Sequence, residues 1–100
     1  MDLFGTDGVR GEVNKDITPE LALKLGKATK LITEKGGSVL VCRDTRKSGR
    51  TLEYALGSGI SAIGRNAYML DVLPSPAVPI LMNEFDAELG AAVSASNNLE

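Results

Sequence analysis

The segment Ser94-Ala95-Ser96 carries the residues best suited to covalent chemistry in this sequence. It follows an apolar run that is typical of a buried strand, so a serine here would meet backbone N–H groups where the next element begins. If that element is a helix, the positive end of its dipole also favours a phosphate. One hypothesis is therefore that a serine carries or contacts a phosphoryl group. The other is a turn or N-cap serine, which the segment by itself favours.

A cationic loop is the second candidate. Residues 43–50 contain four cations, namely Arg43, Arg46, Lys47 and Arg50. Guanidinium groups match the geometry of phosphate and carboxylate, so the loop could clamp either anion. It could equally be a solvated loop with an internal Arg–Asp pair, which is the commoner arrangement. It is not a P-loop, because the lysine precedes its Ser-Gly pair and the glycine spacing differs.

Other polar positions support weaker hypotheses. In the glycine-rich segment 4–11, tight turns could bring Thr6 and Arg10 to a ligand, or the segment could be a plain surface turn. Its three glycines argue against a stable helix or central strand. Around Ser75, the two prolines favour a shaped loop over a ligand contact. Asp71 and Asp86 are expected to be solvated or to cap helices, since no carboxylate cluster has the spacing of a metal site.

Helices and strands that would position these residues alternate along the chain. A first helix is expected from the N-cap Thr18 to Gly36-Gly37, with a buried stripe at Leu21, Leu25, Ala28 and Ile32. A second helix carries Leu52, Leu56, Ile60 and Ile63 and ends at Gly64, and a third carries Val78, Leu81, Met82 and Phe85. Short apolar runs at 39–42, 67–72 and 90–93 predict three strands.

This alternation predicts a parallel sheet that is covered by helices, joined by right-handed crossovers. The loops at 43–49, 73–76 and 94–98 should then leave from the carboxyl edge of the sheet. Open α/β sheets bind their ligands at that edge. The three polar segments are therefore expected to converge on one site.

Composition narrows the function classes. The chain has 100 residues, enough for one domain, and a net charge of −2 without a block of like charge, which argues against a nucleic-acid or anionic-membrane partner. No apolar run approaches the roughly 20 residues of a membrane span, and the start does not resemble a signal peptide. The single cysteine, Cys42, excludes an internal disulfide and fits a reduced cytoplasmic setting. Histidine is absent, so the commonest general base is missing.

Taken together and in order, these motifs resemble the α-D-phosphohexomutase family, and within it the members that act on glucosamine phosphates. The resemblance covers essentially the whole chain. It rests on five motifs in register: Leu3-Phe4-Gly5-Thr6-Asp7-Gly8-Val9-Arg10-Gly11, Ile17-Thr18-Pro19-Glu20-Leu21-Ala22-Leu23-Lys24-Leu25-Gly26, Arg43-Asp44-Thr45-Arg46-Lys47-Ser48-Gly49, Leu73-Pro74-Ser75-Pro76-Ala77-Val78 and Ser94-Ala95-Ser96.

The resemblance implies an intramolecular phosphotransferase, an isomerase that moves phosphate between the C1 and C6 hydroxyls of a hexose phosphate. It assigns the phosphoserine to Ser96, which would also contact a Mg²⁺ ion through its phosphate, and a catalytic role to Arg10. Thr6 and Arg46, with Asn97 and Asn98, are the implied phosphate-binding residues. The expected reaction interconverts glucosamine 6-phosphate and glucosamine 1-phosphate through a bisphosphorylated sugar. The alternatives are a domain acting on mannose and glucose phosphates and a non-catalytic module that binds a phosphate ester or a partner chain.

The sequence departs from the family pattern in two ways. The serine loop of the family usually continues His-Asn-Pro, whereas this chain reads Asn97-Asn98-Leu99, and asparagine cannot pass a proton near neutral pH. Family members also run to four domains. We therefore expect residues 1–100 to be a truncated N-terminal domain, a three-layer α/β/α sandwich with a mainly parallel but incomplete sheet. Such a chain would be inactive alone, would need the missing domains as partners, and could self-associate.

Overall fold

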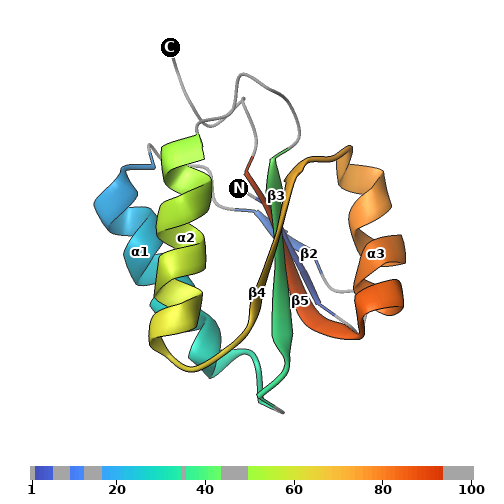
Figure 1. Ribbon diagram of the computed structural model, residues 1–100, viewed down its shortest axis with the longest axis horizontal. Coiled ribbons are helices and arrows are strands. Elements are labelled where there is room, and N and C mark those ends of the chain that lie inside the picture. Colours follow the sequence, from blue (N-terminus) through green and yellow to red (C-terminus); the bar gives the residue numbers. More distant parts are fainter. Residues whose placement is uncertain (1, 6–9, 13–16, 35, 44–49, 94–100) are drawn as a thin grey trace.

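A mixed β-sheet forms the middle layer of the molecule (Figure 1). The computed structural model describes residues 2–5, 10–12, 17–34, 36–43 and 50–93. Across these residues the sheet has the order β2-β1-β5-β3-β4. Its strands are β1 (Asp2–Gly5), β2 (Arg10–Glu12), β3 (Ser38–Arg43), β4 (Ala67–Val72) and β5 (Ala87–Val93).

Strands β4, β3 and β5 run parallel to one another, which confirms the three predicted strands and their direction. Strand β1 is antiparallel to both β5 and β2. The expectation that the glycine-rich segment 4–11 avoids an interior strand was wrong at its start, because Phe4 and Gly5 belong to β1, which lies between two strands. Ladder hydrogen bonds on both sides of β1 offset the entropy that Gly5 loses on ordering.

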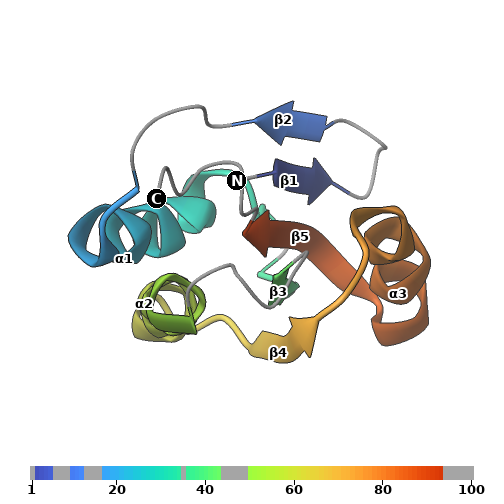
Figure 2. The same ribbon diagram turned by 90° about the horizontal axis from the view of Figure 1, so that it is seen from above.

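Helices cover both faces of the sheet, as Figure 2 shows from above. Helices α1 (Pro19–Ala28) and α2 (Arg50–Ala62) lie on one face, and α3 (Val78–Phe85) lies on the other. Successive side chains of β3 alternate between the two cores, so Val39 and Val41 pack toward α1 and α2 whereas Leu40 and Cys42 pack toward α3. All four are fully buried. The three-layer α/β/α fold expected from the sequence is confirmed.

The buried face of the first helix is shifted from the one predicted, since Leu25 packs against the core as expected but Ala28 is exposed. Its N-terminus is as expected, since the Thr18 side chain accepts a hydrogen bond from the Leu21 N–H at 3.1 Å. The helix ends at Ala28 and continues as a 3₁₀ turn, Thr29–Leu31. Ile32, predicted to be buried, is 51% exposed, and the buried positions are Ala22, Gly26, Thr29 and Thr33. Helix α2 approaches α1 so closely that only small side chains fit between the two backbones.

The other two helices match the sequence pattern more closely. In α2 the predicted Leu52, Leu56 and Ile60 are buried, and Gly64 follows with a φ of 82°. In α3 Val78 and Met82 are buried. Phe85 is 41% exposed and stacks on Tyr68 of β4, with ring centroids 5.1 Å apart.

Candidate functional site

The carboxyl ends of the three parallel strands lie level with one another. The Cα of Arg43, at the end of β3, is paired with Val93 at the end of β5 and with Val72 at the end of β4. The three loops predicted to converge therefore all start from one edge, because each follows one of these strand ends directly. Residues 44–49 and 94–98 themselves lie outside the described residues.

Five of the six predicted site residues also lie outside the described part of the chain. They are Thr6, Arg46, Ser96, Asn97 and Asn98. For Arg10 the structure describes the backbone in β2, where its Cα is paired with Phe4, which is in turn paired with Gly90 of β5. Arg10 is thus level with the middle of β5, about 10 Å along the strand from Val93.

A buried ion cluster occupies the carboxyl edge at the ends of β3 and β4. Arg43 is 3% exposed and Glu53 of α2 is 2% exposed. The Nε atom of Arg43 lies 2.9 Å from Oε1 of Glu53, and its NH2 group pairs with the Asp71 carboxylate of β4. The guanidinium of Arg43 is therefore paired with two carboxylates that lie outside the 43–49 loop. The two interpretations of the loop as a whole stay predictions, because residues 44–49 lie outside the described part of the chain.

Sequence reasoning missed Glu53, although a signal was present. It shares the buried face of α2 with Leu56 and Ile60, at a helical spacing of three and four residues. A carboxylate on an apolar stripe needs a buried partner, because an unpaired charge there is costly. Asp71 was expected to be solvated or to cap a helix. Its side chain is 67% exposed, yet it pairs with Arg43.

Burial raises the pKa of the Glu53 carboxyl, and the Arg43 charge and the Asp71 N–H act against that rise. The hydrogen bond that the Arg43 guanidinium donates to the Asp71 carboxylate is the main cause that raises the pKa of Arg43. Arg43 is therefore cationic at neutral pH.

The end of β4 is shaped by an irregular pairing with β3. Val41 is paired with Met69 and Arg43 with Val72, so β4 contains one more residue than β3 in this interval. Asp71 lies in the interval and adopts a φ of 65°, which is rare for a residue with a side chain. The backbone N–H of Asp71 donates to Oε2 of Glu53 at 3.2 Å. Beyond the strand, the N–H of Leu73 donates to the carbonyl of Arg43 at 2.7 Å.

The loop after β4 is a structured turn. Pro74 has a φ of −62° and precedes a 3₁₀ turn, Ser75–Ala77, in which the Ala77 N–H donates to the Pro74 carbonyl. The prolines therefore shape this loop as predicted. Ser75 is partly buried in this turn.

Nowhere in residues 2–5, 10–12, 17–34, 36–43 and 50–93 do three metal-ligating side chains of His, Cys, Asp or Glu come together. Among the same residues, no helix has the length and apolar character needed to cross a membrane.

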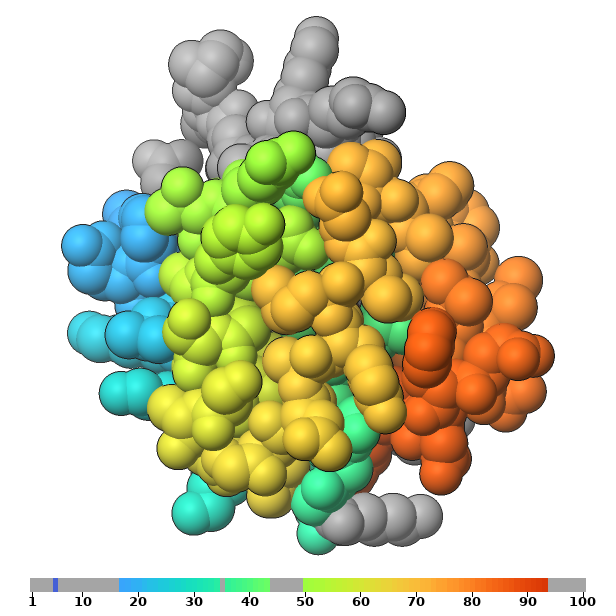
Figure 3. Space-filling view, viewed as in Figure 1, coloured from blue at the N-terminus to red at the C-terminus, as the bar shows by residue number. Residues whose placement is uncertain are grey.

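A shallow groove lies beside β4, on the face that Figure 3 shows. It is lined by residues of α2 and β4, most of them small, together with the larger Tyr54 and Met69. Tyr54 is 57% exposed and Met69 is 38% exposed. The lining residues are Tyr54, Gly57, Ser58, Ser61, Ala62, Ala67 and Met69.

Comparison with known proteins gives a consistent assignment. Residues 1–100 match the family described as phosphoglucomutase/phosphomannomutase, alpha/beta/alpha domain I. The chain is 50% identical over 99 residues to a phosphoglucosamine mutase of Carboxydothermus hydrogenoformans, and 46% identical over 99 residues to one of Nitrobacter winogradskyi. It is also 50% identical over 100 residues to a phosphoglucosamine mutase of Staphylococcus carnosus.

These alignments cover 95–96% of this chain but 22% of each relative, so the chain spans about a fifth of the length of the proteins it matches. No solved structure matches it. The matched family is defined by an α/β/α domain, which is the layer order found here. The chain therefore belongs to the phosphoglucomutase/phosphomannomutase family, as its alpha/beta/alpha domain I.

Proposed function

We propose that this chain is the N-terminal, phosphoserine-bearing domain of a mutase that interconverts glucosamine 6-phosphate and glucosamine 1-phosphate. The observation that carries the proposal is the level pairing of Arg43 with Val93. It means that the segment leading to Arg46 and the segment leading to Ser96 begin side by side at the carboxyl edge. The names of the relatives, all phosphoglucosamine mutases, support the choice of sugar.

In the proposed reaction the Oγ–P bond of phosphorylated Ser96 breaks as a free hydroxyl of the sugar phosphate attacks phosphorus. The sugar becomes a bisphosphate, and Ser96 then takes the phosphoryl group from the other position. In this scheme the phosphate oxygens accept hydrogen bonds from five side chains, namely those of Thr6, Arg10, Arg46, Asn97 and Asn98. A Mg²⁺ ion bound through the phosphate of Ser96 would offset the charge on the transferring group.

Phosphoryl transfer by Ser96 can be tested on this chain directly. After incubation with a hexose 1,6-bisphosphate and Mg²⁺, intact mass should rise by one phosphoryl group, and peptide mapping should place it on Ser96. Ser96→Ala should abolish the gain, whereas Ser94→Ala should retain it. A phosphate on Ser94, or an equal gain in Ser96→Ala, would overturn the assignment.

We further propose that the chain alone does not complete the mutase cycle. Catalysis of phosphoryl transfer depends on positioning and charge stabilisation, and the matched relatives are about five times longer than the alignment. With glucosamine 6-phosphate, a bisphosphate activator and Mg²⁺, turnover should not exceed background. Turnover that disappears in Ser96→Ala would contradict the need for further domains.

Two alternatives have a specific observation in their favour. The description of the matched family names phosphoglucomutase and phosphomannomutase, so mannose and glucose phosphates are rival substrates. Asn97, at the position where the family usually has histidine, favours a non-catalytic module that binds phosphate esters. A Ser96 that stays free of phosphate while the chain still binds a sugar phosphate would support the second alternative.

We also propose that the chain self-associates, in the cytoplasmic setting that its buried thiol Cys42 fits. Strand β4 is an edge strand of the described sheet, and its residues Met69 and Val72 are partly exposed. An edge strand with apolar side chains is a template for pairing with a second copy. Sedimentation should show a concentration-dependent dimer, and a monomer at all concentrations would refute it.

A further inference from the structure

We infer that Glu53 is a positioning residue, whose carboxylate sets the relative placement of the β3 and β4 ends and, through them, of the phosphate-binding loops. The inference rests on the proposed function for what those loops bind. How the strand ends are held is argued from the geometry of Glu53, Arg43 and Asp71.

Glu53 contacts two different strands with two different oxygen atoms. Its Oε1 lies 2.9 Å from the Nε of Arg43, the last residue of β3. Its Oε2 accepts the backbone N–H of Asp71, where β4 departs from regular pairing. One buried side chain on α2 therefore joins two strand ends that are distant from each other in the sequence.

A carboxylate is required for this bridge. Its Oε1 pairs with the cationic Arg43 guanidinium and its Oε2 accepts the Asp71 N–H, so both oxygens face groups that carry N–H donors. An amide of the same shape has one acceptor and one donor, so it must turn an N–H₂ group toward either Arg43 or the Asp71 N–H. Either arrangement places two donors face to face and loses one arm of the bridge.

The bridge acts on the segments that leave the sheet. Arg43 immediately precedes residues 44–49, and its carbonyl accepts the N–H of Leu73, which begins the loop after β4. Asp71 is held with a φ of 65°, a conformation that its side chain disfavours and that surrounding contacts must maintain. Loss of the Glu53 bridge should therefore let the two strand ends shift against each other.

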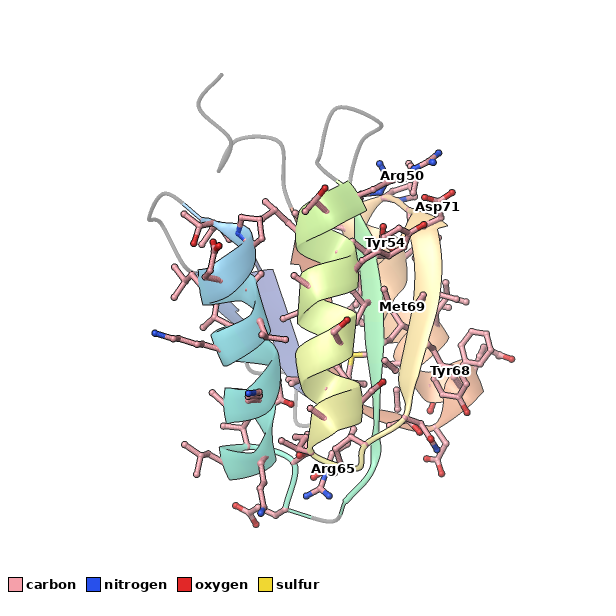
Figure 4. The ribbon with its side chains drawn as sticks, turned by 60° about the vertical axis from the view of Figure 1, so that its left-hand side comes forward. Arg50, Tyr54, Arg65, Tyr68, Met69 and Asp71 are labelled. Atoms are coloured by element: carbon pink, nitrogen blue, oxygen red, sulfur yellow. The ribbon has the colours of Figure 1, made fainter. Side chains whose placement is uncertain are left out.

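A matched control is available at the opposite end of the sheet. Figure 4 shows Asp71 toward the end of the molecule at which α2 begins with Arg50, and Arg65 at the far end of that helix. Arg65 also joins two distant segments through one side chain, the one after α1 and its 3₁₀ turn and the one after α2, since its Nε and Nη2 atoms donate to the side chain and carbonyl of Thr33, each at 3.1 Å. Arg65→Met therefore removes a comparable tie without touching the carboxyl edge.

The experiment compares the wild-type 100-residue chain with Glu53→Gln and Arg65→Met. Inorganic phosphate is titrated and amide chemical shifts are followed, and hydrogen exchange of the Leu73 amide is measured relative to Val41 in the core. In Glu53→Gln we expect phosphate affinity to fall about tenfold or more and Leu73 exchange to accelerate about tenfold relative to Val41. In Arg65→Met both quantities should equal those of the wild type.

Each other outcome has a defined meaning. Unchanged Leu73 exchange in Glu53→Gln overturns the inference, as does faster exchange with unchanged phosphate affinity, because Glu53 would then be merely structural. If the wild type shows no saturable phosphate shift, the proposed function fails at this site, and Leu73 exchange then decides only whether Glu53 holds the two strand ends together. Should Glu53→Gln not fold, a double variant that combines Arg43→Met and Glu53→Leu removes both charges at similar side-chain volume. The same two measurements are then made on this double variant.

Discussion

Gly26 of α1 and Gly59 of α2 face each other where the two helices cross. A Cβ added to Gly26 would lie 2.3 Å from the Leu56 carbonyl oxygen and 2.9 Å from the Cα of Gly59. A Cβ added to Gly59 would lie 2.3 Å from the Leu23 carbonyl oxygen. The obstructing atoms belong to the backbone, so no side-chain rotation can relieve either contact. The two glycines therefore set how closely α1 and α2 pack.

Gly26→Ala should destabilise the protein by about 1–3 kcal/mol, because the helices must separate to admit the methyl group. At an unconstrained helix position the same change stabilises by about 1 kcal/mol. Urea unfolding measures the difference, and Ser58→Ala, at an exposed position of α2, is the control. A stabilised Gly26→Ala protein would mean that the helices are not in close contact in solution.

Thr18→Ala should lower the free energy of unfolding by about 1 kcal/mol, since Leu21 N–H would lose its side-chain acceptor. Thr18→Ser keeps the hydroxyl and should stay close to the wild type in thermal unfolding. If alanine and serine behave alike, the cap does not contribute to stability.

Asp86→Gly should stabilise the chain by about 0.5–1 kcal/mol. Asp86 ends α3 in the left-handed region, with a φ of 53° and an exposed side chain, and glycine adopts that conformation without a steric penalty. Asp86→Ala removes the same carboxylate but retains a Cβ, so it should be less stable than Asp86→Gly. The order of the two variants in denaturant unfolding checks the prediction, and the reverse order would contradict it.

Because burial raises the pKa of Glu53, this residue should make the free energy of unfolding larger at acidic pH than at neutral pH. Its pKa is raised above the ordinary value of 4.5, so the folded chain binds this proton more tightly than the unfolded chain does. As pH falls through the folded-state pKa, the free energy of unfolding should therefore rise relative to that of Glu53→Gln. Once the pH is below the ordinary pKa of 4.5, Glu53 is protonated in both states, and the difference in free energy of unfolding between the two proteins should no longer change.

Urea unfolding of both proteins across acidic pH measures this difference. A difference that shrinks as pH falls would mean that the Arg43 charge outweighs the burial of Glu53. The Glu53 carboxyl would then be held ionised in the fold, with a lowered pKa.

Much of the architecture is determined by local sequence. The β-branched and apolar runs of β3 and β5, the Thr18-Pro19 helix start and the stop at Gly64 depend on neighbours within a few residues of the chain. Alternation of strand and helix then leaves a parallel sheet with covered faces as the simple solution. The candidate phosphate-binding segments follow from the same pattern, because loops after parallel strands share one edge.

Tertiary structure decided which faces are buried and which charges meet. The face of α1 was mispredicted because hydrophobicity favours Ile32, whereas the backbone approach at Gly59 admits only Ala22, Gly26 and their small neighbours. Likewise, the sequence around Arg43 leaves two interpretations open, a ligand clamp and a solvated loop with an internal Arg–Asp pair. The Arg43 partners Glu53 and Asp71 lie 10 and 28 positions further along the chain, and only folding brings them to it. A contact between distant segments leaves no local pattern, since its energy depends on geometry that the whole fold creates.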